Sequence, residues 1–363
     1  MNNEVEQELE KIREGLKPPS IAVIGRTGTG KSSLIKAILG LDDDEIKVGA
    51  GFPVTERYER YPFPHNQDTP IILYDSPGYE ASKTDDFLEE TLKFLRDKSL
   101  SNTESVDDCI HLIWYLIHGG LGRIEYFDKQ VIQTLLSEKI PIIMVLSRCD
   151  TAQPEKLSKL RKKLSEVLAD IEQTANTQLK IMEVSADPIP GKTVSGLKEL
   201  TEESKKAIPE LYAEAFIRAQ RVNIKLKRKP AYSLIGKTAG ACFGLSFIPI
   251  PGSTKLSVMG TQPALLASIA KLYNLDPFLN NGITAATIAF SGLLVIVGAT
   301  ILDVATTFLS GIFPPLFIPG KSITGVVAAS YILAVGLAYT STLEALSIRR
   351  LNSNMNKKDI KNS

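Results

Sequence analysis

The sequence predicts an α/β doubly wound parallel sheet, followed by an all-α, hydrophobic helical domain. Three observations support this. Apolar, strand-like runs alternate with helical ones as far as about residue 200, polar or glycine-rich motifs follow those runs, and two long uncharged stretches lie in the C-terminal third. At 363 residues the chain is too long for one ordinary domain. Ligands of such a sheet bind at the carboxyl ends of its strands, so the motifs there are the candidate site.

The overall composition excludes few classes of protein. The net charge is +1, so no global field attracts nucleic acid. Residues 1–17 are acidic, lack the apolar core of a signal peptide and predict a solvated helix. Cys109, Cys149 and Cys242 fit no metal-binding spacing, so we expect buried thiols in a reducing, cytoplasmic compartment.

The first motif is Gly25–Ser32, which matches G-x-x-x-x-G-K-[ST] between the apolar run 20–24 and the helical run 33–40. Backbone N–H groups and the helix N-terminus would hold phosphates there. Lys31 would reach the β- and γ-phosphates and Ser32 would bind Mg²⁺. A glycine-rich turn of an unrelated α/β protein is the alternative. The predicted phosphate-binding residues are Arg26, Thr27, Gly28, Thr29, Gly30, Lys31, Ser32 and Ser33.

A second motif, Asp75-Ser76-Pro77-Gly78, follows the predicted strand 69–74. Asp75 would hold Mg²⁺ through water, and the Gly78 N–H would meet a γ-phosphate. Thr55 lies on a glycine-rich loop between the two motifs, where a residue that senses the γ-phosphate is expected. The predicted metal ligands are therefore Ser32, Thr55 and Asp75, and the predicted catalytic residues are Lys31, Thr55 and Gly78.

The remaining α/β elements follow in order. We expect strands over 56–61, 109–117, 140–146 and 180–184, and helices over 125–136 and 154–172. The third of these strands ends in Ser147-Arg148-Cys149-Asp150, and the fourth is followed by Ser185-Ala186. His111 lacks a nearby acidic or cysteine partner, so we interpret it as structural rather than as a ligand.

The order of these motifs resembles that of translation-factor-class GTPases, most closely the Era/TrmE-like, ribosome-binding group, over about residues 18 to 220. The resemblance implies binding of GTP and GDP with Mg²⁺, and hydrolysis of GTP to GDP and phosphate. It also implies that Asp150 accepts hydrogen bonds from guanine, that Arg148 stacks on the base, and that Ser185 and Ala186 contact the guanine carbonyl.

This sequence shows three departures. Gly28 stands where potassium-activated relatives carry asparagine or aspartate, which argues against potassium dependence. Ser147 stands where the family has the asparagine that braces the base pocket, which puts affinity in question. Tyr79 follows Gly78, where Ras-like enzymes have a water-orienting glutamine. We therefore expect slow intrinsic turnover.

A long helical pattern covers Leu197–Leu226, becomes basic toward Lys225–Lys229 and is broken by Pro230. It is either a solvated helix end or a basic collar at a membrane surface. Nucleic acid is not indicated, because no aromatic side chains are interleaved with the charges.

The uncharged stretches Ile283–Leu302 and Val326–Tyr339 are rich in small residues and long enough to cross a hydrocarbon core of about 30 Å. With the apolar turn Phe308–Gly320 between them, they predict a hairpin with both ends cytoplasmic. A soluble bundle with an amphipathic helix over Leu256–Tyr273 is the alternative.

The same region, about residues 230 to 345, resembles the YcjF-like domain of unknown function. The resemblance rests on Phe247–Gly252, residues 266–273 and Ile318-Pro319-Gly320. It implies fusion to a GTPase and association with a membrane.

The predicted domains are an N-terminal extension (1–17), a G domain (18–200), a basic linker helix (201–229), a hydrophobic helical domain (230–345) and a polar tail (346–363). The predicted function is a GTP-hydrolysing switch that acts on a helical domain at the inner face of a membrane. A ribosome or RNA assembly factor and a nearly inactive nucleotide-binding scaffold stay open as alternatives. Membrane lipid and a second copy bound through the G domain are candidate partners.

Overall fold

The computed structural model describes residues 17–41, 59–63, 71–76, 84–99, 103, 105–121, 124, 126–137, 140–175, 179–245, 253–275 and 317–361. Among the described residues, one compact unit comprises residues 17–223 together with 354–361, and the other comprises residues 224–353. We call them the sheet unit and the helical unit, and we describe each by itself.

The sheet unit is built on six strands in the order β2-β3-β1-β4-β5-β6. All neighbouring pairs are parallel except β2 and β3. The predicted doubly wound architecture is therefore confirmed. The strands are β1 (Ser20–Gly25), β2 (Glu59–Phe63), β3 (Ile71–Asp75), β4 (Leu112–His118), β5 (Ile142–Ser147) and β6 (Lys180–Glu183).

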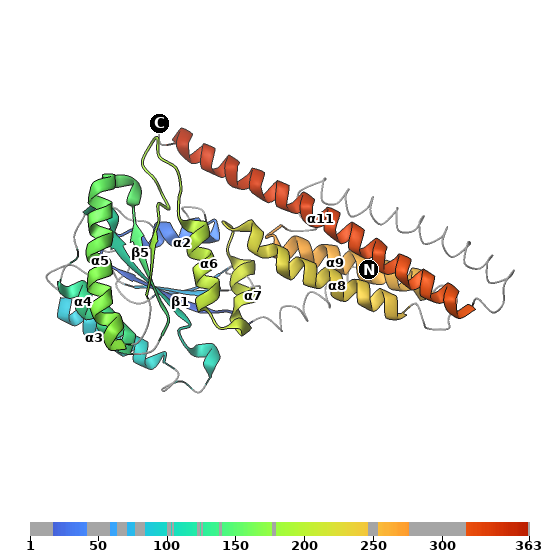
Figure 1. The fold of residues 1–363 in the computed structure, drawn as a ribbon, viewed down its shortest axis with the longest axis horizontal. Helices are drawn as coiled ribbons and strands as arrows, with labels where there is room; N and C mark the ends of the chain where they lie inside the picture. The colour runs from blue at the N-terminus through green and yellow to red at the C-terminus, as the bar shows by residue number, and fades with distance from the viewer. Residues whose placement is uncertain are drawn as a thin grey trace. The chain divides into compact units, whose positions relative to one another are not determined.

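Helices cover both faces of this sheet (Figure 1). One face packs against α2 (Lys31–Leu39), α6 (Leu197–Ala207) and α7 (Glu210–Ala219). The other packs against α3 (Thr84–Asp97), α4 (Tyr126–Ser137) and α5 (Pro154–Ala175). Successive side chains of a strand point to opposite faces, so the fully buried Trp114 and Tyr115 enter different cores.

The single helix expected over 197–226 is not present. The chain forms α6, α7 and a short 3₁₀ helix, Ile224–Lys227, because Pro209 follows α6 and the backbone is extended again at Gln220. Leu200 and Phe216 belong to the core of the sheet unit. Residues 201–223, which the sequence placed in a linker, are thus part of the sheet unit.

The helical unit contains α8 (Arg228–Leu245), α9 (Ser253–Leu272) and α11 (Phe317–Lys361). Pro230 lies in the first turn of α8 rather than ending a helix, and proline is tolerated there because those N–H groups have no partner within the helix. The helices α8 and α11 approach closely: a Cβ atom added to Gly336 would lie 2.7 Å from the Ile235 side chain.

The two candidate membrane stretches have different outcomes. Ile283–Leu302 lies outside the described residues, whereas Val326–Tyr339 lies within α11. Among the described helices, Ala328–Leu351 is long and apolar enough to cross a membrane, by length and composition alone, and 39% of it is buried. The segment Phe317–Gly320, expected as part of a turn, forms the first turn of α11.

The helix α9 differs from the predicted amphipathic helix. None of its described side chains from 261 to 272 is exposed, and even Gln262 and Ser268 are buried. The solvent-exposed polar face expected for Leu256–Tyr273 is therefore absent from residues 261–272, the part of α9 whose side chains are described.

Candidate functional site

The glycine-rich loop connects the end of β1 to the first residue of α2, as the motif predicts. Gly28 and Gly30 have φ angles of 79° and 83°, in the left-handed region that favours glycine. The N–H of Leu34 donates to the Gly30 carbonyl, which starts the helix. The free N–H groups of the first turn of α2 therefore face the loop, as anion binding requires.

Lys31 lies folded into this loop. Its Nζ donates to the carbonyl oxygens of Gly25 at 3.0 Å and Arg26 at 3.4 Å. Burial lowers the pKa of Lys31, and the nearby Asp75 carboxylate opposes that shift. A desolvated ammonium of this kind is stabilised by added negative charge, such as phosphate oxygens.

Two predicted metal ligands meet at the carboxyl end of β3. The Ser32 hydroxyl donates to Asp75 Oδ2 at 3.2 Å, and Asp75 is 2% exposed. A hydroxyl and a carboxylate fit Mg²⁺, which prefers oxygen ligands and usually keeps phosphate oxygens and waters in its shell. The predicted ligand Thr55, the predicted catalytic Gly78 and the neighbouring Tyr79 lie outside the described residues.

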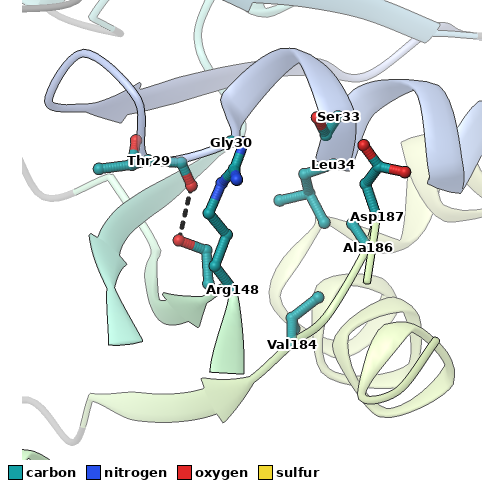
Figure 2. A pocket seen from close by; sticks show the side chains of 9 residues that line it. Thr29, Gly30, Ser33, Leu34, Arg148, Val184, Ala186 and Asp187 are labelled. Carbon is teal, nitrogen blue, oxygen red and sulfur yellow. Dashed lines mark hydrogen bonds between the residues drawn. The ribbon is translucent and has the colours of Figure 1, made fainter. Parts of the chain in front are cut away.

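Ser147 joins the end of β5 to the glycine-rich loop. Its hydroxyl lies 2.6 Å from the Thr29 carbonyl oxygen, to which it donates, and 3.2 Å from that of Ile117. The dashed line in Figure 2 marks the bond to Thr29. The position where the family has asparagine therefore still carries a side chain that braces the loop.

The two carboxylate oxygens of Asp150 have different surroundings. Its Oδ2 accepts from the Ile189 N–H at 2.9 Å, and its own N–H donates to the Ser185 hydroxyl at 3.0 Å. Its Oδ1 is buried and has no hydrogen-bond partner among the described residues. A buried acceptor without a donor costs about 1–3 kcal/mol, so a ligand N–H at this atom would be stabilising.

A small pocket lies between the glycine-rich loop and the residues at and just after the ends of β5 and β6 (Figure 2). Arg148 borders it with a left-handed backbone, φ 51°, and its side chain lies beside Gly30. Ala186 lies on the opposite wall. The lining residues are Thr29, Gly30, Ser33, Leu34, Ser147, Arg148, Val184, Ala186 and Asp187.

Arg26, a predicted phosphate-binding residue, lies beside a carboxylate of the protein. The Arg26 guanidinium lies 3.7 Å from Asp128 Oδ2, and Asp128 Oδ1 accepts from the Tyr115 hydroxyl at 3.0 Å. Asp128 is buried in the first turn of α4. Sequence reasoning missed it, because its partners come from two other elements and no motif marks it.

The Cys149 thiol at this site is half-buried and hydrogen-bonded. The Cys149 Sγ donates to the Leu146 carbonyl at 3.0 Å, and burial raises the pKa of Cys149 to about 11. The expectation of buried thiols is confirmed for Cys109 and Cys242, while Cys149 is half-buried.

Residues 20–148 match the family model described as 50S ribosome-binding GTPase. GTPase Era of Clostridium kluyveri is 26% identical over 152 residues, which are 42% of this chain and 47% of that protein. GTPase Era of Clostridium beijerinckii is 26% identical over 190 residues, covering 52% and 55%. The chain thus spans about half the length of the curated relatives it matches.

A search of solved structures matches Arabidopsis thaliana Toc33 in complex with Mg²⁺ and GMPPNP. The identity is 17%, the match covers 59% of this chain and 88% of that chain, and the TM-score is 0.37. Another match is Era in complex with MgGDPNP and a segment of 16S ribosomal RNA, at 20% identity, covering 53% and 58% with a TM-score of 0.36. The family model thus covers the part of the chain that carries the glycine-rich loop, Asp75 and Ser147.

Proposed function

We propose that this protein binds GTP with Mg²⁺, hydrolyses it to GDP and phosphate, and uses its nucleotide state to control a membrane-associated helical unit. One observation carries the nucleotide assignment. The buried ammonium of Lys31 and the hydrogen-bonded oxygens of Ser32 and Asp75 lie at the glycine-rich loop. The same sheet unit contains Asp150, whose Oδ1 has no hydrogen-bond partner among the described residues. These groups suit the two ends of one nucleotide.

Each group has a separate task in this proposal. Lys31 and the first turn of α2 bind the β- and γ-phosphates, and Ser32 and Asp75 hold Mg²⁺ directly or through water. The metal ion would neutralise charge that develops on the phosphates. Asp150 accepts from the guanine N–H and amino groups, while Arg148, Ser185 and Ala186 border the base. Thr55 and Gly78 complete the γ-phosphate side.

The helical unit supports the membrane part of the proposal. Val326, Leu333 and Leu337 of α11 are between 40% and 53% exposed, and they recur at helical spacing on one face. The neighbouring Ser341 and Thr342 hydroxyls donate to carbonyls four residues earlier at 3.0 and 2.9 Å. These hydroxyls therefore need no water, which suits an apolar environment.

The direct test measures two properties of the full-length protein. Equilibrium titration with GTP, GDP and ATP should show guanine-specific binding that requires Mg²⁺, and phosphate release should be slow but measurable. Flotation with vesicles that contain anionic lipid should recover the protein with the vesicles. Binding without any turnover would favour the nucleotide-binding scaffold instead.

A soluble assembly factor is the second candidate, favoured by the ribosome-binding description of the matching family model. Sedimentation with ribosomal subunits in the presence of a GTP analogue tests it. Co-sedimentation with subunits, together with no recovery on vesicles, would replace the membrane proposal. Sedimentation equilibrium in each nucleotide state tests for a homodimer through the sheet unit.

A further inference from the structure

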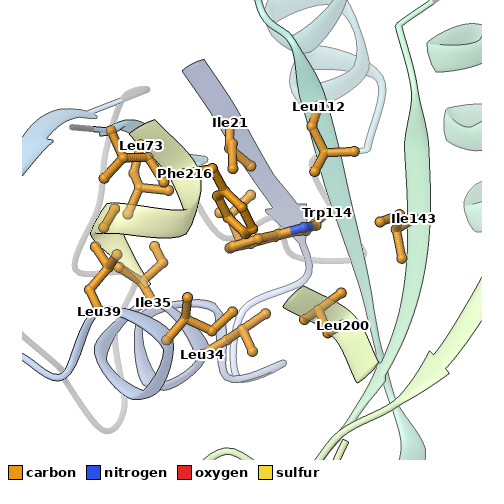
Figure 3. Packing of buried hydrophobic residues seen from close by; sticks show 14 of the residues in the cluster. Ile21, Leu34, Ile35, Leu39, Leu73, Leu112, Trp114, Ile143, Leu200 and Phe216 are labelled. Atoms are coloured by element: carbon orange, nitrogen blue, oxygen red, sulfur yellow. The ribbon is translucent and has the colours of Figure 1, made fainter. Parts of the chain in front are cut away.

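The side chains at the end of β1 point alternately to the two faces of the sheet. On one face, Ile21 of β1 and Trp114 of β4 share a core with Leu34 of α2 (Figure 3). On the other face, Ile24 of β1 and Tyr115 of β4 lie in the core that α4 also joins. Because side chains alternate along a strand, the even-numbered residues of β1 point to the α4 face.

Arg26 continues this alternation just beyond β1. It follows Ile24 by two positions, so its side chain is directed to the α4 face and away from α2. Its guanidinium NH2 accordingly lies 3.7 Å from Oδ2 of Asp128, which belongs to the first turn of α4. The side chain that the sequence placed among the phosphate-binding groups therefore lies beside α4.

Asp128 is a buried carboxylate with defined neighbours. Its side chain is 5% exposed, and its Oδ1 accepts from the Tyr115 hydroxyl at 3.0 Å. Tyr115 is itself fully buried and lies opposite Ile24 in the pairing of β4 with β1. A buried carboxylate is costly without a nearby positive charge, so Asp128 stabilises a cation where the Arg26 guanidinium lies.

The backbone carbonyl of Arg26 organises the glycine-rich loop. It accepts from Thr29 Oγ1 at 2.8 Å, from the Thr29 N–H at 3.2 Å and from Lys31 Nζ at 3.4 Å. Lys31 is the cation proposed for the β- and γ-phosphates. The position of this one carbonyl oxygen therefore affects the position of the main phosphate-binding side chain.

The rest of the loop gives little stiffness of its own. Gly28 and Gly30 have φ angles of 79° and 83°, and glycine has more conformational freedom than any other residue. A contact outside these glycines can therefore limit the freedom of the loop. The ion pair between Arg26 and Asp128 is such a contact, because it holds the side chain of the residue whose carbonyl meets Lys31.

We propose that Asp128 is a positioning residue for the nucleotide phosphates. Acting through Arg26, it holds the Arg26 carbonyl where Thr29 and Lys31 meet it, and the Tyr115 hydroxyl orients the carboxylate. This role rests on the proposed function, because phosphate binding is the property that it serves. Arg26 contributes through its ion pair and its backbone, and its guanidinium stays on the α4 face when nucleotide binds.

The test is a double-variant cycle on the dissociation constants of Mg²⁺-GDP and a non-hydrolysable GTP analogue, measured with the full-length protein. Asp128→Asn removes the charge and keeps an acceptor for Tyr115. We expect Asp128→Asn and Arg26→Gln each to weaken binding about tenfold, and the double variant to bind no more weakly than either. Arg26→Lys keeps a cation and should stay within about threefold of wild type. Asp86→Asn, at an exposed position of α3, is the control.

A direct contact of the Arg26 guanidinium with phosphate gives a different pattern. Loss of the Asp128 charge would then free the guanidinium for the ligand, so Asp128→Asn would bind as tightly as wild type or more tightly, while Arg26→Gln would still bind weakly. That pattern would overturn the positioning role. Independent effects of the two single variants, which multiply in the double variant, would also overturn it.

Tyr115→Phe provides a second variant if Asp128→Asn does not fold, which the melting temperature of the nucleotide-free protein reports. It removes only the hydroxyl that orients Asp128 and should weaken binding about threefold. Unchanged affinity in Tyr115→Phe would contradict the role. Wild type that binds no guanine nucleotide would refute the proposed function itself, and the role of Asp128 would fail with it.

Discussion

The Ser147 hydroxyl donates to the Thr29 carbonyl oxygen at 2.6 Å and so ties the end of β5 to the glycine-rich loop across 118 residues of sequence. Serine is shorter than the asparagine of the resembled family, yet it reaches the loop because β5 and β1 are separated by one strand only. The sequence departure therefore does not leave the loop without its brace. It removes a carboxamide from the pocket wall.

Ser147→Ala should weaken GTP binding about 5- to 30-fold, because the buried Thr29 carbonyl loses its donor at a cost of about 1–2 kcal/mol. The measurement is the dissociation constant for GTP with Mg²⁺. Ser158→Ala, on the exposed side of α5, serves as the matched control and should bind normally. An unchanged affinity in Ser147→Ala would show that the hydrogen bond does not position the loop.

Lys31→Ala and Ser32→Ala should each abolish Mg²⁺-dependent GTP binding and leave the melting temperature of the nucleotide-free protein within a few degrees. Both side chains act on ligand charge rather than on packing, and burial already lowers the pKa of Lys31. The exposed Lys163→Ala is the control for loss of a positive charge. Normal affinity in Lys31→Ala would refute the phosphate assignment.

Asp150→Asn should shift preference from GTP toward xanthosine triphosphate, because an amide offers a donor where the carboxylate offered an acceptor. The Ile189 N–H that now binds Oδ2 keeps one acceptor position filled, so the change acts at Oδ1. Competition binding with both nucleotides measures the ratio, and Asp86→Asn, at an exposed position of α3, is the control. Equal binding of ATP and GTP by wild type would contradict the role of Asp150.

The sheet and most of its site could be predicted from local patterns. Each buried strand is a short apolar run, and each motif follows such a run, so topology alone brings Lys31, Asp75 and Asp150 to one edge. Partners far apart in sequence could not be predicted. Arg228 looked like part of a solvated basic cluster, because Glu344 lies 116 residues away and no periodicity connects them.

The helix boundaries predicted over 197–226 were wrong for a related reason. The apolar periodicity of α6 continues into α7, so the pattern over 197–226 indicated one helix. The break comes from Pro209, which favours the extended backbone seen at Ile208, and α6 and α7 then both place side chains in the sheet core. Likewise, the polar residues of α9 suggested a solvated face, but α9 lies within a core that also takes side chains from α8 and α11.

Cys149 should react slowly with iodoacetamide despite its position beside the nucleotide site. With its pKa raised to about 11, the thiolate population at pH 8 is about 100-fold lower than for a thiol with a pKa of about 9. The rate should rise about tenfold per pH unit up to that pKa. Mass spectrometry of the modified peptide measures it, and Cys149→Ser identifies the signal. Rapid modification at pH 8 would mean that the site opens.

The exposed face of α11 gives the sharpest test of membrane association. Leu333 and Leu337 are 40% and 43% exposed, so replacing both by aspartate should leave the helical unit folded. If this face enters the apolar part of a bilayer, the change removes about 1.5 kcal/mol or more per leucine and adds the cost of burying two carboxylates. Vesicle recovery should then fall at least 100-fold.

Leu211→Asp provides the matched control for that experiment, since Leu211 of α7 is 60% exposed but belongs to the sheet unit. It should bind vesicles as the wild type does, and both variants should bind GTP normally. Within the basic cluster 225–229, Lys227 is fully buried and Arg228 is paired with Glu344, whereas Lys225 and Lys229 are exposed. Vesicle binding that persists in the α11 variant but disappears in high salt would therefore place the membrane contact on surface charges instead.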